Sequence, residues 1–193
     1  MSEAARDEVA TVLETEQVSP RAYTVLVSSL CESVRHVHDR WNDFSTLRER
    51  AMNEYAANDE VAWVAVAYAI HNFYNALEHY FQQINQFTRG HLEKRHWHGD
   101  LVDRMALSVP GIRPALLRTE EIESFHELRS FRRAFRSVFD RRLDIRRVAI
   151  ATAFAEDAMA TIEKRHGEFC AAVSTNGDAA PLHAAEAAAL ENV

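Results

Sequence analysis

Apolar residues recur in steps of three and four over two long stretches of this chain, and this period constrains its fold most. The first series is Val27, Leu30, Val34, Val37, Trp41, Phe44, Leu47, Ala51 and Tyr55. The second is Trp63, Val66, Ile70, Phe73, Leu77, Tyr80, Ile84 and Phe87. Such spacing gathers apolar side chains on one face of an α-helix. We therefore predict two long amphipathic helices that pack antiparallel, since each needs the other to cover its apolar face.

Turn and capping residues set the predicted helix ends. Ser19-Pro20 favours a helix start, Asn58-Asp59 ends the first helix and caps the second, and Gly90 ends the second. Further helices are predicted near 97–107, near 120–139 with Thr119 as N-cap, and after Asp144. The 193 residues include only 5 Gly and 4 Pro, and no stretch alternates like a strand. The prediction is an all-α bundle of about five helices built on a long antiparallel hairpin.

The composition is that of an ordinary soluble domain, with 47% hydrophobic and 26% charged residues. We predict an N-terminal extension at 1–18, a helical domain at 19–172 and a disordered tail or loosely held helix at 173–193. No apolar run suggests a membrane span and no signal peptide is visible, so a cytoplasmic location is expected. Cys31 and Cys170 are interpreted as buried thiols.

Four arginines share one predicted helix face: Arg129, Arg132, Arg133 and Arg136, which we call the arginine stripe. The whole chain has a net charge of −7, so this basic patch is a local feature. Guanidinium groups bind phosphate through forked, charge-assisted hydrogen bonds, which makes the phosphates of RNA or of a nucleotide natural ligands.

A second interpretation of the stripe stays open, in which acidic neighbours pair with these arginines on a solvated face. The acidic candidates are Glu121, Glu123, Glu127, Asp140 and Asp144. Glu78 lies within the apolar second helix, where a carboxylate either faces water or pairs with a cation such as a stripe arginine.

Histidines offer two further kinds of chemistry. His91, His96 and His98 have the spacing H-x4-H-x-H, yet surface histidines are favoured over a metal site, and no metal or cofactor is expected. His71 and His126 could act as general bases, although nothing in their spacing singles them out.

Four pieces of the chain, in order, resemble the HepT-like members of the HEPN superfamily. They are Tyr74-Asn75-x-x-Glu78, Trp97-His98-x-x-Leu101 with Met105, Pro110-Gly111-Ile112-Arg113-Pro114, and L-R-S-F-R-R-A-F-R-S-V-F from Leu128 to Phe139. The resemblance implies an all-α fold and a homodimer. It also implies metal-independent RNA cleavage at the dimer cleft and control by a nucleotidyltransferase antitoxin. Tyr74, Glu78, His98 and Arg113 are the supporting site residues on this reading.

The catalytic motif of that family, R-x4-H-x-Y, falls on Arg132, Ser137 and Phe139. Serine is a poor proton acceptor near neutral pH, and phenylalanine has no hydroxyl to be adenylylated. Three hypotheses follow: a degenerate domain that binds RNA, a nucleotide or a partner without cutting; an enzyme in which His98, His126 or Tyr74 supplies the missing chemistry; or a deliberate exchange of the tyrosine. An RNA-acting member of a prokaryotic toxin–antitoxin or defence module is the leading hypothesis, and a non-catalytic binding protein is the alternative.

Overall fold

The computed structural model describes residues 18–52, 59–90, 100–136 and 143–190, with side chains up to 176. Within these ranges the chain forms helices and no β-strand, which confirms the predicted all-α bundle. The elements are α2 (Pro20–Met52), α3 (Glu60–Gly90), α4 (Leu101–Met105), the 3-10 helix η2 (Thr119–Glu121), α5 (Ile122–Arg136) and α6 (Ile145–Leu190).

Local capping residues start the long helices where the sequence predicts. The Ser19 hydroxyl accepts a hydrogen bond from the Ala22 amide at 3.3 Å, and Pro20 takes the first helical position of α2. Asp59 and Asp144 cap α3 and α6, each accepting a backbone N–H two residues further on, at 2.9 and 3.0 Å. These caps satisfy amides that have no partner inside their own helix.

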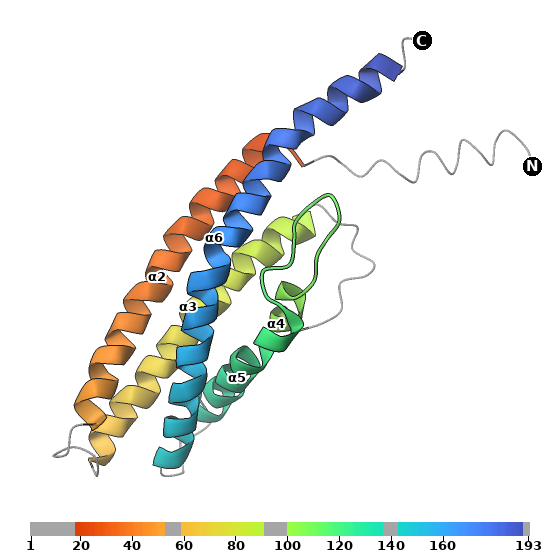
Figure 1. Ribbon diagram of the computed structural model, residues 1–193. Coiled ribbons are helices and arrows are strands. Elements are labelled where there is room, and N and C mark those ends of the chain that lie inside the picture. Colours follow the sequence, from red (N-terminus) through yellow and green to blue (C-terminus); the bar gives the residue numbers. More distant parts are fainter. Residues whose placement is uncertain (1–17, 53–58, 91–99, 137–142, 191–193) are drawn as a thin grey trace, which may run out of the picture.

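Helices α2 and α3 form the predicted antiparallel hairpin. Tyr23 meets Phe87 with ring centroids 5.4 Å apart, and Trp41 meets Phe73 at 5.5 Å. As the residue number rises along α2, the number of the contacting residue on α3 falls, so the two helices run antiparallel. The hairpin and α6 lie side by side along the molecule (Figure 1).

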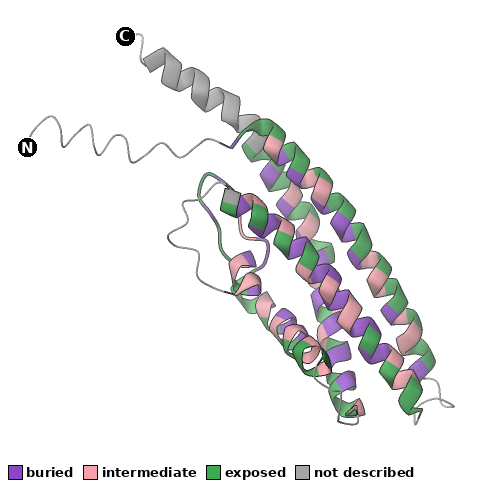
Figure 2. Cartoon of the chain, turned by 180° about the vertical axis from the view of Figure 1, so that it is seen from behind, coloured by how far each residue is buried: buried purple, intermediate pink, exposed green. Residues whose placement is uncertain are grey.

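Helix α5 packs against α3 and α6 and brings the arginine stripe to the hairpin (Figure 1). Phe125 contacts Phe81 at 5.4 Å, and Phe135 contacts His71 at 5.7 Å, so α5 is also antiparallel to α3. Buried and exposed positions alternate along every long helix, as the apolar period requires (Figure 2). The centre of the core is fully buried and includes Leu30, Val37, Phe44, Phe73, Leu77, Ile84, Phe125 and Ile162.

Two predictions differ from the structure. Thr119 is the first residue of η2 and not a cap: the Arg118 amide before it donates to the Glu121 carboxylate at 2.9 Å. Helix α6 continues past residue 172 to Leu190, and the domain boundary at that residue stays a prediction. Cys31 is exposed and only Cys170 is partly buried, so the prediction of two buried thiols is wrong.

In the part of the chain that the structure describes, no helix is both long enough and apolar enough to cross a lipid bilayer.

Candidate functional site

The arginine stripe runs along α5 beside α3, and its members differ in exposure. The side chains of Arg129 and Arg132 are 29% and 23% exposed, whereas Arg133 and Arg136 are exposed residues. The apolar flank of the same helix explains this gradient, because Phe125 and Leu128 anchor α5 in the core and set how the helix is turned. Half of the stripe therefore faces α3 and half faces solvent.

Arg132 is the most connected residue of the stripe. Its Nη2 atom lies 3.1 Å from Oε2 of Glu78, and its Nε atom donates to Oδ1 of Asn75 at 2.6 Å. Its guanidinium carbon also lies 5.9 Å from the centre of the Tyr74 ring, close enough for a cation–π contact. The predicted pairing of Glu78 with a stripe arginine is confirmed. These contacts fix the position of the guanidinium and use Nε and Nη2, while Nη1 makes no hydrogen bond to any described residue.

Arg129 pairs with Asp100, which also caps α4 by accepting the Val102 amide at 3.0 Å. This acidic partner was not among the predicted ones. Glu121 instead binds Arg165, and Asp144 lies near Arg147. Partners from α3 and from the start of α4 thus neutralise half of the stripe, so the acidic-neighbour interpretation holds for Arg129 and Arg132, with different acids.

Arg133 and Arg136 form no ion pair with any residue in the described ranges. Both are exposed, so their charges stay hydrated and available to an anion. The sequence predicts a cationic surface here, and these two residues supply it.

His71 lies one helical turn before Asn75 on α3, and sequence reasoning did not single it out. Because Asn75 Oδ1 accepts from Arg132, the Asn75 amide nitrogen faces His71 Nε2, at 3.1 Å. This bond makes Nε2 the acceptor and assigns the ring proton to Nδ1, which is buried and has no hydrogen-bond partner among the described residues. Burial, followed by the charges of Arg132 and Arg136, lowers the pKa of His71.

A visible signal could have pointed to His71. His71, Asn75 and Glu78 follow at i, i+4 and i+7, so they form one stripe on α3, and that stripe faces the arginines of α5. A polar stripe within an apolar helix is the sequence pattern that indicates this contact.

Two predicted supporting residues have other surroundings. Tyr74 is 1% exposed, and burial followed by the Glu78 charge raises its pKa to about 12, so its hydroxyl stays protonated near neutral pH. Its ring contacts the Arg132 guanidinium, and its hydroxyl is a poor candidate for proton transfer. His126 Nε2 lies 2.8 Å from a carboxylate oxygen of Asp103, away from the Arg132 contacts.

Arg113 is 2% exposed and is committed to the loop around it. Its guanidinium donates to the Thr88 hydroxyl at 2.8 Å and to the carbonyls of Arg104, Leu107 and Pro114 at 2.9, 2.7 and 3.0 Å. None of these partners belongs to the stripe, so Arg113 ties the loop after α4 to α3 and its contacts do not reach the candidate site.

Several predicted residues lie outside the described part of the chain. Ser137, Phe139 and His98 are among them, as are the metal candidates His91 and His96. Among the residues that are described, no three histidine, cysteine, aspartate or glutamate side chains converge as metal ligands.

One comparison with known proteins identifies a family. A family model described as HepT-like protein matches residues 65–173, a span that holds His71, Glu78 and the whole arginine stripe. Searches of curated proteins and of solved structures gave no match. Because the matched span is more than half of the 193 residues, the chain belongs to the HepT-like protein family.

Proposed function

We propose that this HepT-like protein acts on RNA within a prokaryotic toxin–antitoxin or defence module, with Arg132 at the centre of its phosphate site. The observation that carries the proposal is the chain of contacts from Glu78 through Arg132 and Asn75 to His71, flanked by the two exposed cations of Arg133 and Arg136. A fixed guanidinium with exposed cations beside it suits a phosphodiester, because the first orients the group and the others add attraction.

In this proposal His71 supplies the proton transfer that Ser137 cannot. Its lowered pKa keeps the imidazole neutral at neutral pH, so Nε2 can exchange the Asn75 hydrogen bond for a proton from the RNA. The 2′-hydroxyl gives its proton to His71, its oxygen attacks the neighbouring phosphorus, and the bond to the 5′-oxygen breaks. Water protonates the leaving oxygen, and Arg132 stabilises the negative charge that builds up on the phosphate.

A non-catalytic binding role is the second candidate. Two observations favour it: Ser137 and Phe139 replace the family histidine and tyrosine, and Glu78 already neutralises part of the Arg132 charge. On this reading the protein holds RNA, a nucleotide or a partner protein through the same residues without cutting.

We also propose a homodimer, with a nucleotidyltransferase antitoxin as a possible partner. The family resemblance supports both, and the Phe-rich flank of α5 suits a helix–helix interface. Phe131 and Phe135 stack with ring centroids 6.0 Å apart and are only partly buried in the single chain. Light scattering on the full chain tests the dimer, and a monomer at working concentrations would contradict it.

Parallel cleavage and binding assays on single-stranded RNA test the proposal. Arg132→Ala should abolish cleavage and weaken binding about tenfold or more, the loss expected for a charge-assisted phosphate contact. His71→Gln should abolish cleavage and keep binding, because glutamine retains a polar contact near Nε2 and cannot take up a proton. Arg21→Ala removes one exposed charge from the start of α2 and serves as the control.

The outcomes separate the two roles. Cleavage lost in both variants supports the enzyme. Binding by the wild-type protein without any cleavage supports the binder, and no interaction with RNA would overturn both RNA roles.

A further inference from the structure

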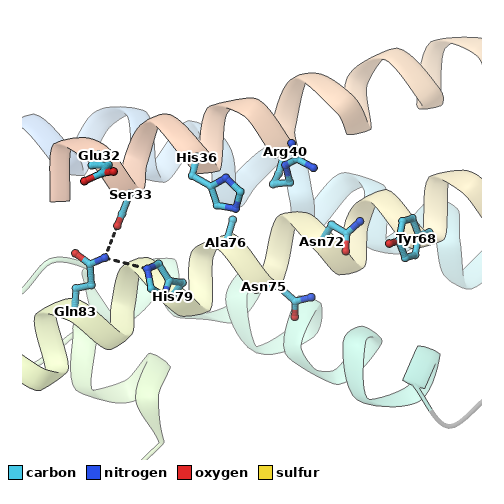
Figure 3. Close-up of a pocket in the computed structure, with 10 residues that line it drawn as sticks. All are labelled: Glu32, Ser33, His36, Arg40, Tyr68, Asn72, Asn75, Ala76, His79 and Gln83. Carbon is cyan, nitrogen blue, oxygen red and sulfur yellow. Dashed lines mark hydrogen bonds between the residues drawn. The ribbon is translucent and has the colours of Figure 1, made fainter. Parts of the chain in front are cut away.

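A cavity of about 790 Å³ lies between α2 and α3, and one residue of its lining, Asn75, also contacts Arg132 of the arginine stripe. Ser33, His36 and Arg40 line it from α2, while Tyr68, Asn72 and Asn75 line it from α3 (Figure 3). Its size is within the range of pockets that hold small organic ligands, about 300–1,000 Å³.

One end of the cavity is closed by hydrogen bonds and the other carries an aromatic ring. Gln83 on α3 donates to the Ser33 hydroxyl at 2.5 Å and contacts His79 at 3.1 Å, which ties the helices together at the end near Glu32. Tyr68 marks the opposite end (Figure 3). A negatively charged ligand would therefore meet Glu32 only at the closed end, away from Tyr68.

Two contacts join the cavity to the Arg132 site. Asn75 lines the cavity and also accepts the hydrogen bond from Arg132 Nε. Tyr68 stacks on His71 with ring centroids 6.5 Å apart and an interplanar angle of 25°. Asn75 and Tyr68 thus connect the two sites around α3, so a nucleoside attached to a phosphate at Arg132 has to reach across the exposed face of α3 to enter the cavity.

The lining offers what an unpaired base requires. Tyr68 is 57% exposed although it is a large aromatic residue, so its ring is available for stacking. The Asn72 amide makes no hydrogen bond to a described residue, and it presents both a donor and an acceptor. An asparagine amide complements the N6 and N7 atoms of adenine in a two-point contact.

Arg40 and His36 line the α2 side of the cavity, together with Glu32 and Ser33. Arg40 pairs with Asp43 at 3.0 Å through Nη1, but its Nε atom is buried without a hydrogen-bond partner in the described part of the chain. His36 extends from α2 toward α3 next to it (Figure 3). These donors suit the sugar and phosphate oxygens of a nucleotide.

We infer that this cavity binds an unpaired base of the RNA strand, with adenine favoured, by stacking on Tyr68 and hydrogen bonding to Asn72. The inference rests on the proposed RNA function and adds a base preference to it. The arginine stripe reads only phosphates, which every RNA shares, whereas base contacts in the cavity discriminate between sequences.

Fluorescence anisotropy with labelled oligoadenylate and oligouridylate tests the inference on the full chain. The wild-type protein should prefer oligoadenylate. Tyr68→Ala and Asn72→Ala should each weaken its binding about tenfold, the range for loss of one stacked or paired base. Tyr68→Phe keeps the ring, and Asn42→Ala removes an exposed asparagine on α2 outside the cavity, so both should bind as the wild type does.

Failure of the inference and failure of the proposed function are distinguishable. If Arg132→Ala weakens RNA binding while Tyr68→Ala and Asn72→Ala do not, the base site is overturned and the RNA function stands. If the wild-type protein binds no RNA, a titration with adenosine tests the cavity by itself. Adenosine carries no phosphate, so its binding does not depend on the arginine stripe. Chemical-shift changes at Tyr68 and Asn72 on adding adenosine would keep the cavity as a nucleoside site, and unchanged shifts would overturn it too.

Discussion

Two groups of arginines in this protein have opposite surroundings. Arg113 and Arg165 are 2% and 5% exposed, and every guanidinium nitrogen has a partner: the hydroxyl of Thr88 and three carbonyls for Arg113, and the carboxylates of Glu121 and Glu168 for Arg165. The stripe on α5 runs from half-buried, paired arginines to exposed ones without an ion pair among the described residues.

This difference separates holding the fold together from presenting charge. A buried guanidinium costs free energy unless its nitrogens are hydrogen-bonded, so a buried arginine bonded through all three nitrogens is committed to structure. An exposed arginine keeps its hydration and contributes little to stability, and neighbouring exposed arginines repel each other. The four predictions that follow test this division, in order of decreasing effect on stability.

Replacing Arg113 should have the largest effect on stability. Arg113→Met leaves Thr88 and three loop carbonyls without their donor, so we expect a loss of about 3 kcal/mol or more in the free energy of unfolding. Urea denaturation followed by circular dichroism measures it. RNA binding by the folded fraction should not change. A loss below about 1 kcal/mol would show that burial and a partner for every guanidinium nitrogen do not identify a structural arginine.

Removing Glu78 should have an intermediate effect. Glu78→Ala deletes the partner of a half-buried guanidinium, so we expect a loss of about 1 kcal/mol in the free energy of unfolding. Glu78→Gln keeps a polar partner and removes the charge. It should therefore cost less and tighten RNA binding at low salt, because Arg132 is no longer neutralised. A melting temperature of Glu78→Ala equal to that of the wild type would contradict the structural half of this prediction.

The exposed pair should affect binding and leave stability unchanged. Arg133→Ala and Arg136→Ala should each alter the free energy of unfolding by less than about 0.5 kcal/mol. Each should also reduce the slope of log K against log salt concentration for single-stranded RNA by about 0.7, the value for one phosphate contact. Titrations at several salt concentrations measure the slope, with Arg21→Ala as the matched loss of charge. Equal slopes for all three variants would contradict a contact between the arginine stripe and the RNA phosphates.

The smallest effect concerns pH. The lowered pKa of His71 means that, near the ordinary histidine pKa of about 6.5, the unfolded chain binds a proton at this residue more readily than the folded chain. The contribution of His71 to stability should therefore fall as the pH drops from about 7 to about 5. His166 and Glu121 also have lowered pKa values and change stability in the same direction. The difference between the wild type and His71→Gln isolates the contribution of His71, and a difference that does not vary with pH would contradict it.

Residues whose role is set by near neighbours in the chain were predicted correctly. Ser19, Asp59 and Asp144 cap the helices that follow them, and Gly90 ends α3, because each acts within a few residues of its own position. Thr119 was assigned wrongly because the carboxylate of Glu121 binds the Arg118 amide, and a 3-10 turn therefore precedes α5.

Residues whose role depends on a second helix were harder to predict. Glu78 was expected to meet an arginine, but the choice of Arg132 depends on how α5 is set against α3. The pairing of Arg129 with Asp100 and the contact of His71 with Phe135 depend on the same packing. Cys31 was misplaced because an apolar helical pattern does not show how α2 is turned toward α6.

By itself, the sequence determined the helical class, the starts of the long helices and the alignment of four arginines on one face, because backbone hydrogen bonds and the period of 3.6 residues act along the chain. The tertiary structure alone decided which acids neutralise Arg129 and Arg132, which arginines stay exposed, and that His71 and the cavity lie beside them. The physical reason is that contacts between helices depend on their register and rotation, which the packing of the whole core selects.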